Sequence, residues 1–372
     1  TMNWEDELYR HHGPLGLPFH FWTLFIGIFG AMTGSFLNVV IHRMPREESI
    51  VHPPSHCPTC NHRIPMWQNM PIFSWLMLRG RCASCRSPIS PRYLGVEALT
   101  GALFVAAWLH YGEQAPWAAA SAAILLAGFV AATFIDFEHF IIPDQITLGG
   151  VGVGFLLSLV APELHQETGI LAALRSSALG ILVGGGVVYL VLRLGKFLFG
   201  RERVALEPGS RVIFHDAGIR LPDREISFEE VFYRESDTVV MEGRHLELAD
   251  RCYVSGEMRL SPKALRIGDE VLDPESEPYL AAEVESLTLP REAMGLGDVK
   301  FMAAIGAFLG WKATLFSLMF SSVLGAVVGL GLIALGRQHL SGRLPYGPYI
   351  AVAATGWVFG GSALWERLFG VR

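Results

Sequence analysis

Residues 294–306 read Met294-Gly-Leu-Gly-Asp298-Val-Lys300-Phe-Met-Ala-Ala-Ile-Gly306, in which one carboxylate stands between a glycine turn and an apolar run. Gly295 and Gly297 permit a sharp turn and let another backbone approach closely before the helical pattern begins. Asp298 suits the N-cap of that helix. An ionisable group at a membrane boundary is costly, however, and is more often functional than incidental. The stretch therefore predicts a helix start that carries a functional acid.

The composition is that of an integral membrane protein. Of the 372 residues, 51% are hydrophobic and 17% are charged, and the mean hydropathy is +0.37. Apolar runs long enough to cross about 30 Å of hydrocarbon recur along the chain, and its 40 glycines suit closely packed transmembrane helices. This balance excludes an ordinary soluble enzyme. We expect a lipid bilayer, and no nucleic acid, among its partners.

The distribution of basic residues predicts the orientation in the membrane. The first apolar run covers about residues 19–41, and residues 42–92 then carry seven arginines against two acids. By the positive-inside rule this loop is cytoplasmic and the N-terminus lies outside. Residues 1–18 are polar and have no basic segment before the apolar run, so we expect no cleaved signal peptide.

Eight transmembrane helices are expected. The predicted spans are residues 19–41, 94–111, 117–135, 146–161, 171–193, 299–310, 313–336 and 348–369. Acids fall in the loops counted as outside and basic residues in the loops counted as inside, which agrees with this number. The predicted fold is an all-α polytopic membrane protein with a cytoplasmic zinc loop and a soluble insert. Its predicted regions are residues 1–41, 42–92, 93–199, 200–293 and 294–372.

Residues 200–293 form the hydrophilic insert, between the fifth and sixth spans. Its apolar segments, such as Thr238–Glu242 and His245–Leu248, are short, partly alternating and separated by Gly, Pro or charged residues. This pattern predicts a small β-rich domain. The solitary Cys252 is expected to be a buried structural thiol.

Two Cys-x-x-Cys pairs in the 42–92 loop predict a zinc site. Cys57 and Cys60 are separated from Cys82 and Cys85 by 21 residues, and four thiolates close a tetrahedral structural site with no place for water. The alternatives are two disulfides or four free thiols. A cytoplasmic location disfavours the disulfides. His56 and His62 flank the first pair and are expected to be surface residues.

Asp136 is the predicted partner of Asp298. Asp136 ends the third span and Asp298 begins the sixth, and both ends fall on the cytoplasmic face in the predicted topology. Because Asp136 follows an unbroken apolar helix, we expect it to be partly desolvated. Two other acids compete for the role. Glu138 is expected to be solvated in a short turn, and Asp144 to cap the fourth span.

Two carboxylates at one depth can share a proton and titrate as a coupled pair. The ionised member then takes a proton from water as the water attacks a peptide carbonyl, and the protonated member donates to the carbonyl oxygen. Such hydrolysis needs neither a metal nor a covalent intermediate. The pattern therefore predicts an aspartic protease at the membrane surface.

Two further charged residues are candidates for supporting roles. Glu97 lies in the second span, and we expect it to be functional or paired internally, because a carboxylate cannot extend far toward water. Lys300 follows the turn at Asp298 and either acts on the site or extends to the membrane interface. The run Gly184-Gly-Gly186 is expected to serve helix packing rather than nucleotide binding.

Several motifs together resemble the type IV prepilin peptidases, membrane aspartic proteases with a Gly-x-Gly-Asp motif. The matching segments are Gly34-Ser-Phe-Leu-Asn-Val-Val-Ile-His-Arg43, the two Cys pairs, Asn69-Met-Pro-Ile-Phe-Ser-Trp75, Leu78-Arg-Gly-Arg-Cys82, Ile89-Ser-Pro-Arg-Tyr93 with Glu97, Asp136 with Pro143-Asp144, Gly295-Leu-Gly-Asp298-Val-Lys300 and Pro345-Tyr-Gly-Pro-Tyr349. They are spread over most of the chain. By this resemblance Asp136 and Asp298 are the catalytic pair.

The resemblance also implies a substrate and a location. Members of the family cut prepilins or pseudopilins whose short basic leader ends in Gly before a hydrophobic helix, on the cytoplasmic side of the bacterial inner membrane. Many also methylate the new N-terminus with S-adenosylmethionine, and pilus or type II secretion assembly components are further expected partners. The insert departs from the family pattern. From its position just before Asp298, we expect it to cover the entrance to the carboxylate pair; binding of the secretion apparatus and a merely decorative role are the alternatives.

Two other functions fit parts of the sequence. A transporter would use the two aspartates as a proton relay, although no repeated broken-helix halves are visible. A non-catalytic scaffold of a secretion machine would rest on the zinc loop and the insert. Cleavage would separate these alternatives from a protease.

Overall fold

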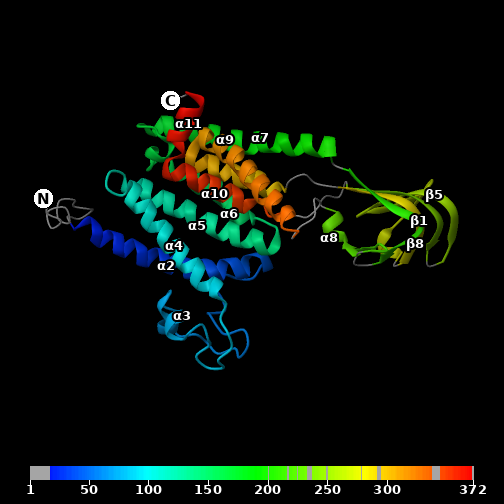
Figure 1. Cartoon of the computed structure of the whole chain (residues 1–372), viewed down its shortest axis with the longest axis horizontal. Coiled ribbons are helices and arrows are strands. Elements are labelled where there is room, and N and C mark those ends of the chain that lie inside the picture. The colour runs from blue at the N-terminus through cyan, green and yellow to red at the C-terminus, as the bar shows by residue number, and fades with distance from the viewer. Residues whose placement is uncertain are drawn as a thin grey trace. The chain divides into compact units, whose positions relative to one another are not determined.

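The chain folds into two compact units. The structure, a computed structural model (Figure 1), describes residues 17–199, 201–215, 218–223, 225–232, 237–248, 250–277, 279–290, 295–336 and 344–370. The first unit runs to residue 189 and resumes at residue 296, and the second covers residues 190–295.

The first unit is built from helices, the last ten residues of α7 being counted with the second unit. They are α2 (Phe19–Arg43), α3 (Phe73–Met77), α4 (Pro91–Tyr111), α5 (Pro116–His139), α6 (Asp144–Leu157), α7 (Ile170–Phe199), α9 (Leu296–Ala334), α10 (Gly347–Gly356) and α11 (Ser362–Phe369). Five of them, α2, α4, α5, α7 and α9, are long and apolar enough to cross a membrane, and α6 is a shorter apolar helix. The prediction of a polytopic membrane protein is thus supported.

The number of crossings remains a prediction. Gly310, with φ 82° and ψ 177°, interrupts α9 where the sequence predicted two spans, residues 299–310 and 313–336. Phe359 and Gly360 also depart from helical angles, so the predicted span 348–369 is divided between α10 and α11. The merging of two spans in α9, the division of the last span and the shortness of α6 together explain why eight apolar runs correspond to five long helices.

Small residues let the helices pack closely. A Cβ atom added to Gly34 of α2 would lie 2.7 Å from the Cα of Glu97 in α4, so these two helices touch through their backbones. A Cβ added to Gly184 of α7 would clash with the carbonyl oxygen of Met302 in α9. The glycine run in α7 therefore serves helix packing at Gly184, as predicted.

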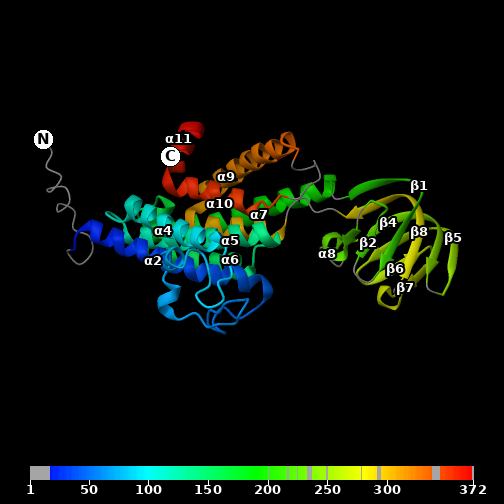
Figure 2. The same cartoon turned by 60° about the horizontal axis from the view of Figure 1, so that its bottom comes forward.

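The second unit is an antiparallel sheet (Figure 2). Its strands are β1 (Arg201–His215), β2 (Gly218–Arg220), β3 (Glu225–Ser227), β4 (Val239–Leu248), β5 (Cys252–Ser261), β6 (Ala264–Ile267), β7 (Glu270–Leu272) and β8 (Tyr279–Pro290), with the short helix α8 (Phe228–Val231). The strand order is β3-β2-β1-β8-β4-β5-β6-β7. The sheet has its own buried core, which includes Val212, Phe214, Met241, Leu246, Met258 and Leu287. The prediction of a β-rich insert is confirmed, and the whole chain is therefore not all-α.

The two ends of the sheet unit lie side by side. The first strand, β1, pairs with the last, β8, and Arg201 is the register partner of Pro290. The chain thus enters and leaves the sheet at adjacent positions. This arrangement lets a domain be inserted between two helices without holding their ends apart.

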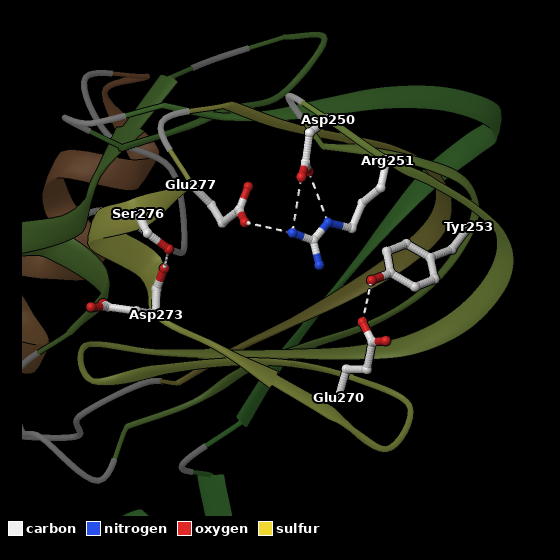
Figure 3. A network of polar contacts seen from close by, with 7 residues as sticks. All are labelled: Asp250, Arg251, Tyr253, Glu270, Asp273, Ser276 and Glu277. Carbon is white, nitrogen blue, oxygen red and sulfur yellow. Dashed lines mark hydrogen bonds and ion pairs between the residues drawn. The ribbon is translucent and has the colours of Figure 1, made fainter.

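A polar group of side chains lies at the start of β5 (Figure 3). The Arg251 guanidinium donates from Nε to Asp250 Oδ1 at 2.8 Å and lies 3.8 Å from the Glu277 carboxylate. The Tyr253 hydroxyl donates to the carboxylate of Glu270. The Tyr253–Glu270 contact joins β5 to β7, and Arg251 joins the segment before β5 to the segment before β8.

Cys252 is exposed at this place, so the prediction of a buried thiol is wrong. Strand alternation puts Cys252 on the same face of β5 as the buried Met258. The core does not reach the first residues of β5, however, and Val254 on that face is 81% exposed. Alternation therefore predicted the correct face of β5 for Cys252, but not that this part of the face is exposed.

Candidate active site

Asp136 lies in the last turn of α5 and is 5% exposed. The backbone N–H of Gly347, the first residue of α10, donates to its Oδ2 at 2.9 Å. A Cβ atom at position 347 would lie 2.8 Å from the same oxygen. Only glycine therefore lets the backbone reach the carboxylate, and this contact fixes how Asp136 is oriented.

The turn that carries Gly347 is held by the second half of α9. The hydroxyl of Tyr346 lies 3.0 Å from Ser321 Oγ and 3.0 Å from Ser322 Oγ. Gly347 also begins a helix, so its N–H is one of those without a partner inside α10. Asp136 supplies that partner.

Asp298 lies in the first turn of α9 and is 9% exposed. Because α9 begins at Leu296, Asp298 is the third residue of the helix, and the prediction that it is the N-cap is wrong. A carboxylate in this turn is still favoured by the positive end of the helix dipole. Asp298 is thus held within the first turn of the helix that follows the Gly-Leu-Gly segment, and not at the position before that helix.

Ile142 connects the surroundings of the two aspartates. A Cβ atom added to Gly297, next to Asp298, would lie 3.5 Å from Ile142 Cβ. A Cβ added to Gly347, which binds Asp136, would lie 3.0 Å from Ile142 Cδ1. One buried isoleucine therefore contacts the glycines beside both acids, which puts Asp136 and Asp298 at the same end of the helical unit.

Asp144 and Lys300 form an ion pair that joins α6 to α9. Lys300 Nζ donates to Asp144 Oδ1 at 2.6 Å, and the two side chains are 35% and 58% exposed, respectively. Asp144 is the first residue of α6 and makes no capping hydrogen bond, since Pro143 occupies the N-cap position. The prediction that Asp144 caps its helix is therefore wrong.

Glu138 pairs with Arg92, the second residue of α4. The pair ties the end of α5, two residues after Asp136, to the start of α4. Glu138 was expected to be solvated in a turn. It is exposed, as expected, but it lies in the last turn of α5 and has a charged partner.

Glu97 is 8% exposed and is bound away from Asp136. Its Oε2 accepts the backbone N–H of Ile72 at 2.7 Å. Ile72 has φ 63°, an unusual backbone angle for a β-branched residue, and it immediately precedes α3. Glu97 thus has the internal partner that the sequence predicted, and this partner lies in the loop between α2 and α4.

The four cysteines of this loop lie together. Their Sγ atoms are all within 4.8 Å of one another, with Cys57 and Cys85 at 3.8 Å and Cys60 and Cys82 at 4.0 Å. Four sulfurs bound at about 2.3 Å from one zinc ion would be spaced by nearly these distances. None of the four forms a disulfide. The group therefore fits a metal ion, and His56 and His62 lie outside it as predicted.

Matching turns position the two cysteine pairs. Asn61 N–H donates to Cys57 O, and Arg86 N–H donates to Cys82 O, while single bridges pair His56 with Arg63 and Arg81 with Pro88. The backbone N–H groups of Cys60 and Thr59 lower the pKa of Cys57 to about 5. A thiolate, the form that binds metal, is thereby favoured at Cys57.

Two residues of the site were not singled out from the sequence. Gly347 appeared only within a matching segment, and Ile142 was not named. The available signal for Gly347 was a glycine that precedes a proline and opens an apolar run. Nothing in the sequence pointed to its contact with Asp136.

Two family profiles match the chain. The Bacterial Peptidase A24 N-terminal domain matches residues 28–111, and the Type IV leader peptidase family matches residues 123–205 and 279–330. Residues 206–278, which hold most of the sheet, lie outside both matches.

Several relatives that share one name with each other match along the chain. A prepilin leader peptidase/N-methyltransferase of Aeromonas hydrophila is 30% identical over 367 residues, which cover 92% of this chain and 91% of the relative. One from Myxococcus xanthus (strain DK1622) is 36% identical over 217 residues, or 53% of this chain and 60% of the relative. One from Burkholderia pseudomallei (strain K96243) is 26% identical over 387 residues, or 96% and 93%. No solved structure matches the chain.

Proposed function

The chain belongs to the type IV prepilin leader peptidase family, and we propose that it removes the basic leader of prepilins or pseudopilins and methylates the new N-terminus. Asp136 and Asp298 are the catalytic pair. Cleavage follows a Gly at the cytoplasmic face of the inner membrane. The observation that carries the proposal is the position of Ile142 between the glycines next to the two acids.

In the proposed reaction, the two carboxylates divide the proton work. One aspartate, ionised, accepts a proton from water as the water oxygen bonds to the carbonyl carbon of the scissile peptide. The other, protonated, donates to the carbonyl oxygen. The Gly347 N–H holds Oδ2 of Asp136 at 2.9 Å, and such fixed positioning supports rapid proton transfer.

Burial of both acids supports this division. Asp136 and Asp298 are 5% and 9% exposed, respectively, and close buried carboxylates do not both ionise readily. Lys300 instead neutralises Asp144. We assign Lys300, Asp144, Gly295 and Gly297 to positioning the start of α9 rather than to proton transfer.

The cytoplasmic location rests on charge. Residues 42–92 are rich in arginine, and the positive-inside rule assigns them to the cytoplasm. Arg92 pairs with Glu138, two residues after Asp136. This contact supports a site at the same membrane face as the arginine-rich loop.

The four cysteines hold one structural zinc ion in this proposal. A closed set of four thiolates leaves no open position for water. The metal therefore orders the loop between α2 and α4, and no step of the hydrolysis passes through it.

The test uses the purified full-length protein and a prepilin, with and without S-adenosylmethionine. Mass spectrometry of the product N-terminus is expected to show loss of the leader in both reactions, and one added methyl group only where the methyl donor is present. An uncut prepilin in both reactions would contradict the proposal and favour a transporter or a scaffold. Cleavage without methylation would contradict only its second half.

A further inference from the structure

A cavity of about 600 Å³ lies between α2, the start of α4 and the zinc loop. Its volume is in the range of sites that take a small organic ligand. The lining residues come from Ser35–Arg43, the zinc loop and Ser90–Glu97. Asp136, Asp298 and Gly347 are not among them, so this cavity is separate from the candidate active site.

Asn38 presents an unused acceptor to the cavity. The residue is 3% exposed, and its Nδ2 donates to the backbone carbonyl of Tyr93 at 3.1 Å. Its Oδ1 is buried and has no hydrogen-bond partner among the described residues. A buried acceptor without a donor is costly, so a ligand that brings an N–H or O–H group would be stabilised here.

Glu97 adds a carboxylate to the same wall. Its Oε2 accepts one N–H from Ile72, and a carboxylate has capacity for several more donors. The one arginine in the lining, Arg43, is committed elsewhere: its Nη1 donates to Ser49 O at 3.0 Å and its Nη2 to Pro53 O at 2.7 Å. The charge of Glu97 is therefore suited to a ligand that is a cation or carries a protonated amine.

Aromatic rings complete the cavity. Trp75 and Tyr93 line it, and the Trp75 indole is fixed by a hydrogen bond from Nε1 to Ile89 O at 3.3 Å. Aromatic faces attract cations and stack with planar heterocycles. A ligand with a positive centre, a planar base and N–H donors would match all of these groups.

We propose that this cavity is the methyl-transfer site, which takes the sulfonium methyl donor together with the new N-terminal amine. The inference rests on the proposed function, since the amine is the product of cleavage. Glu97 is the base that receives the proton of the amine. Asn38 Oδ1 is a positioning acceptor for an N–H of the amine.

The step balances with these groups. The amine nitrogen uses its lone pair to form a bond to the methyl carbon, while the bond from that carbon to the sulfonium sulfur breaks. Both electrons of the broken bond stay on sulfur, which becomes a neutral thioether. The proton that the nitrogen must lose passes to the Glu97 carboxylate and then to water.

The two sites share one layer of side chains. Leu37, next to Asn38, and Val96, next to Glu97, pack in one buried cluster with Ile135, which precedes Asp136. The cleavage and methyl-transfer sites thus lie on either side of a thin apolar wall within the helical unit. A substrate helix can keep its place at the membrane while its new N-terminus moves between them.

The first test fills the cavity. Val39 lines it and is half-buried, so Val39→Trp should weaken binding of radiolabelled S-adenosylhomocysteine about tenfold or more. Methylation should fall with it, while prepilin cleavage stays within about threefold. The control is Val327→Trp, whose valine is 64% exposed on α9. Wild-type affinity in the Val39→Trp protein would overturn the proposal.

The second test removes the base. Glu97→Gln keeps an acceptor for Ile72 N–H, so we expect normal cleavage, normal S-adenosylhomocysteine binding and methylation slowed about a hundredfold. Glu113→Gln, an exposed acid just beyond the other end of α4, is the matched control. A wild-type methylation rate in the Glu97→Gln protein would overturn the role of Glu97.

A third measurement needs no variant. Ultraviolet crosslinking of radiolabelled S-adenosylmethionine to the wild-type protein should label peptides within residues 34–97, and label found only elsewhere would overturn the site. Wild-type protein that cleaves but neither binds nor methylates would defeat the methyltransferase half of the proposed function itself. That result is distinct from a wild type that methylates through another site.

Discussion

The helical unit and the sheet unit are held together in different ways. In the helical unit, candidate site residues are positioned by single contacts between distant segments, such as the Gly347 N–H on Asp136. The sheet unit is instead held together by a continuous ladder of paired strands and by its own buried core. The family profiles match residues 28–111, 123–205 and 279–330, and thus omit residues 206–278 of the sheet unit. This difference supports the proposal that the chemistry belongs to the helices and that the sheet is an addition.

The largest expected effect is the loss of cleavage in two aspartate variants of the helical unit. If this loss is not seen there alone, the contrast between the two units does not hold. Asp136→Asn and Asp298→Asn should each reduce prepilin cleavage about ten-thousandfold or more, because each removes one half of the proton transfer. Asp269→Asn, in the exposed turn between β6 and β7, is the control in the sheet unit. Cleavage rates of the three purified variants are the measurement. Equal losses in all three would show that the chemistry is not confined to the helices.

Gly347→Ala tests the contact that orients Asp136. The added Cβ would lie 2.8 Å from Asp136 Oδ2, so the carboxylate must move, and misplacement of this size lowers cleavage about a hundredfold. Gly356→Ala, in the same helix, adds a Cβ with nothing within 4 Å and should have little effect. If both variants cleave at the wild-type rate, the Gly347 contact does not matter for catalysis.

Cysteine variants compare the zinc loop with the sheet. Cys57→Ser combined with Cys82→Ser should lose the bound zinc, since two of four thiolates are gone. We expect methylation to fall about tenfold or more and cleavage to fall less, because the loop walls the cavity and not the Asp136 site. Cys252→Ser, at an exposed position in β5, should keep zinc and both activities. Metal analysis by mass spectrometry and product mass provide the readouts.

Deletion of the sheet tests whether it covers the entrance to the acids, as its place in the sequence suggests. Replacing residues 202–289 with a short linker joins Arg201 to Pro290, which are already paired. We expect a folded membrane protein whose cleavage rate or choice among prepilins changes about tenfold. Unchanged rates on several prepilins would remove any role for the sheet in substrate entry.

The smallest expected effect concerns the Lys300–Asp144 pair. Both side chains are partly exposed, at 35% and 58%, and such ion pairs contribute about 0–1 kcal/mol. Lys300→Met, Asp144→Asn and the double variant should therefore differ little in thermal unfolding and change cleavage less than tenfold. A much larger loss in Lys300→Met alone would assign Lys300 to the catalytic machinery.

The sequence predicted the features that depend on local pattern. The apolar runs, the cysteine spacing and the alternating segments of the insert led to the membrane helices, the four-sulfur group and the sheet. Glu97 was also expected to have an internal partner, since a buried carboxylate in an apolar helix needs one. Each of these inferences used residues that lie close together or a residue type with few alternatives.

The wrong predictions concern the burial of side chains and their contacts with residues far away in the sequence. Asp144 was assigned to a cap and the ion pair of Glu138 was missed, because their partners, Lys300 and Arg92, lie far away in the chain. Cys252 was assigned to a core that ends before it reaches the start of β5. Local pattern fixes which face a side chain occupies, but tertiary packing decides what lies against that face.

The pairing of Arg201 with Pro290 has a consequence for how such proteins vary. A module whose two ends meet can be gained, lost or exchanged in one genetic event, since the flanking helices need not be refitted. Among relatives, length variation should therefore concentrate at this junction and be rare within the helices. The same junction is also a suitable insertion site for a fluorescent protein or an affinity module within the chain.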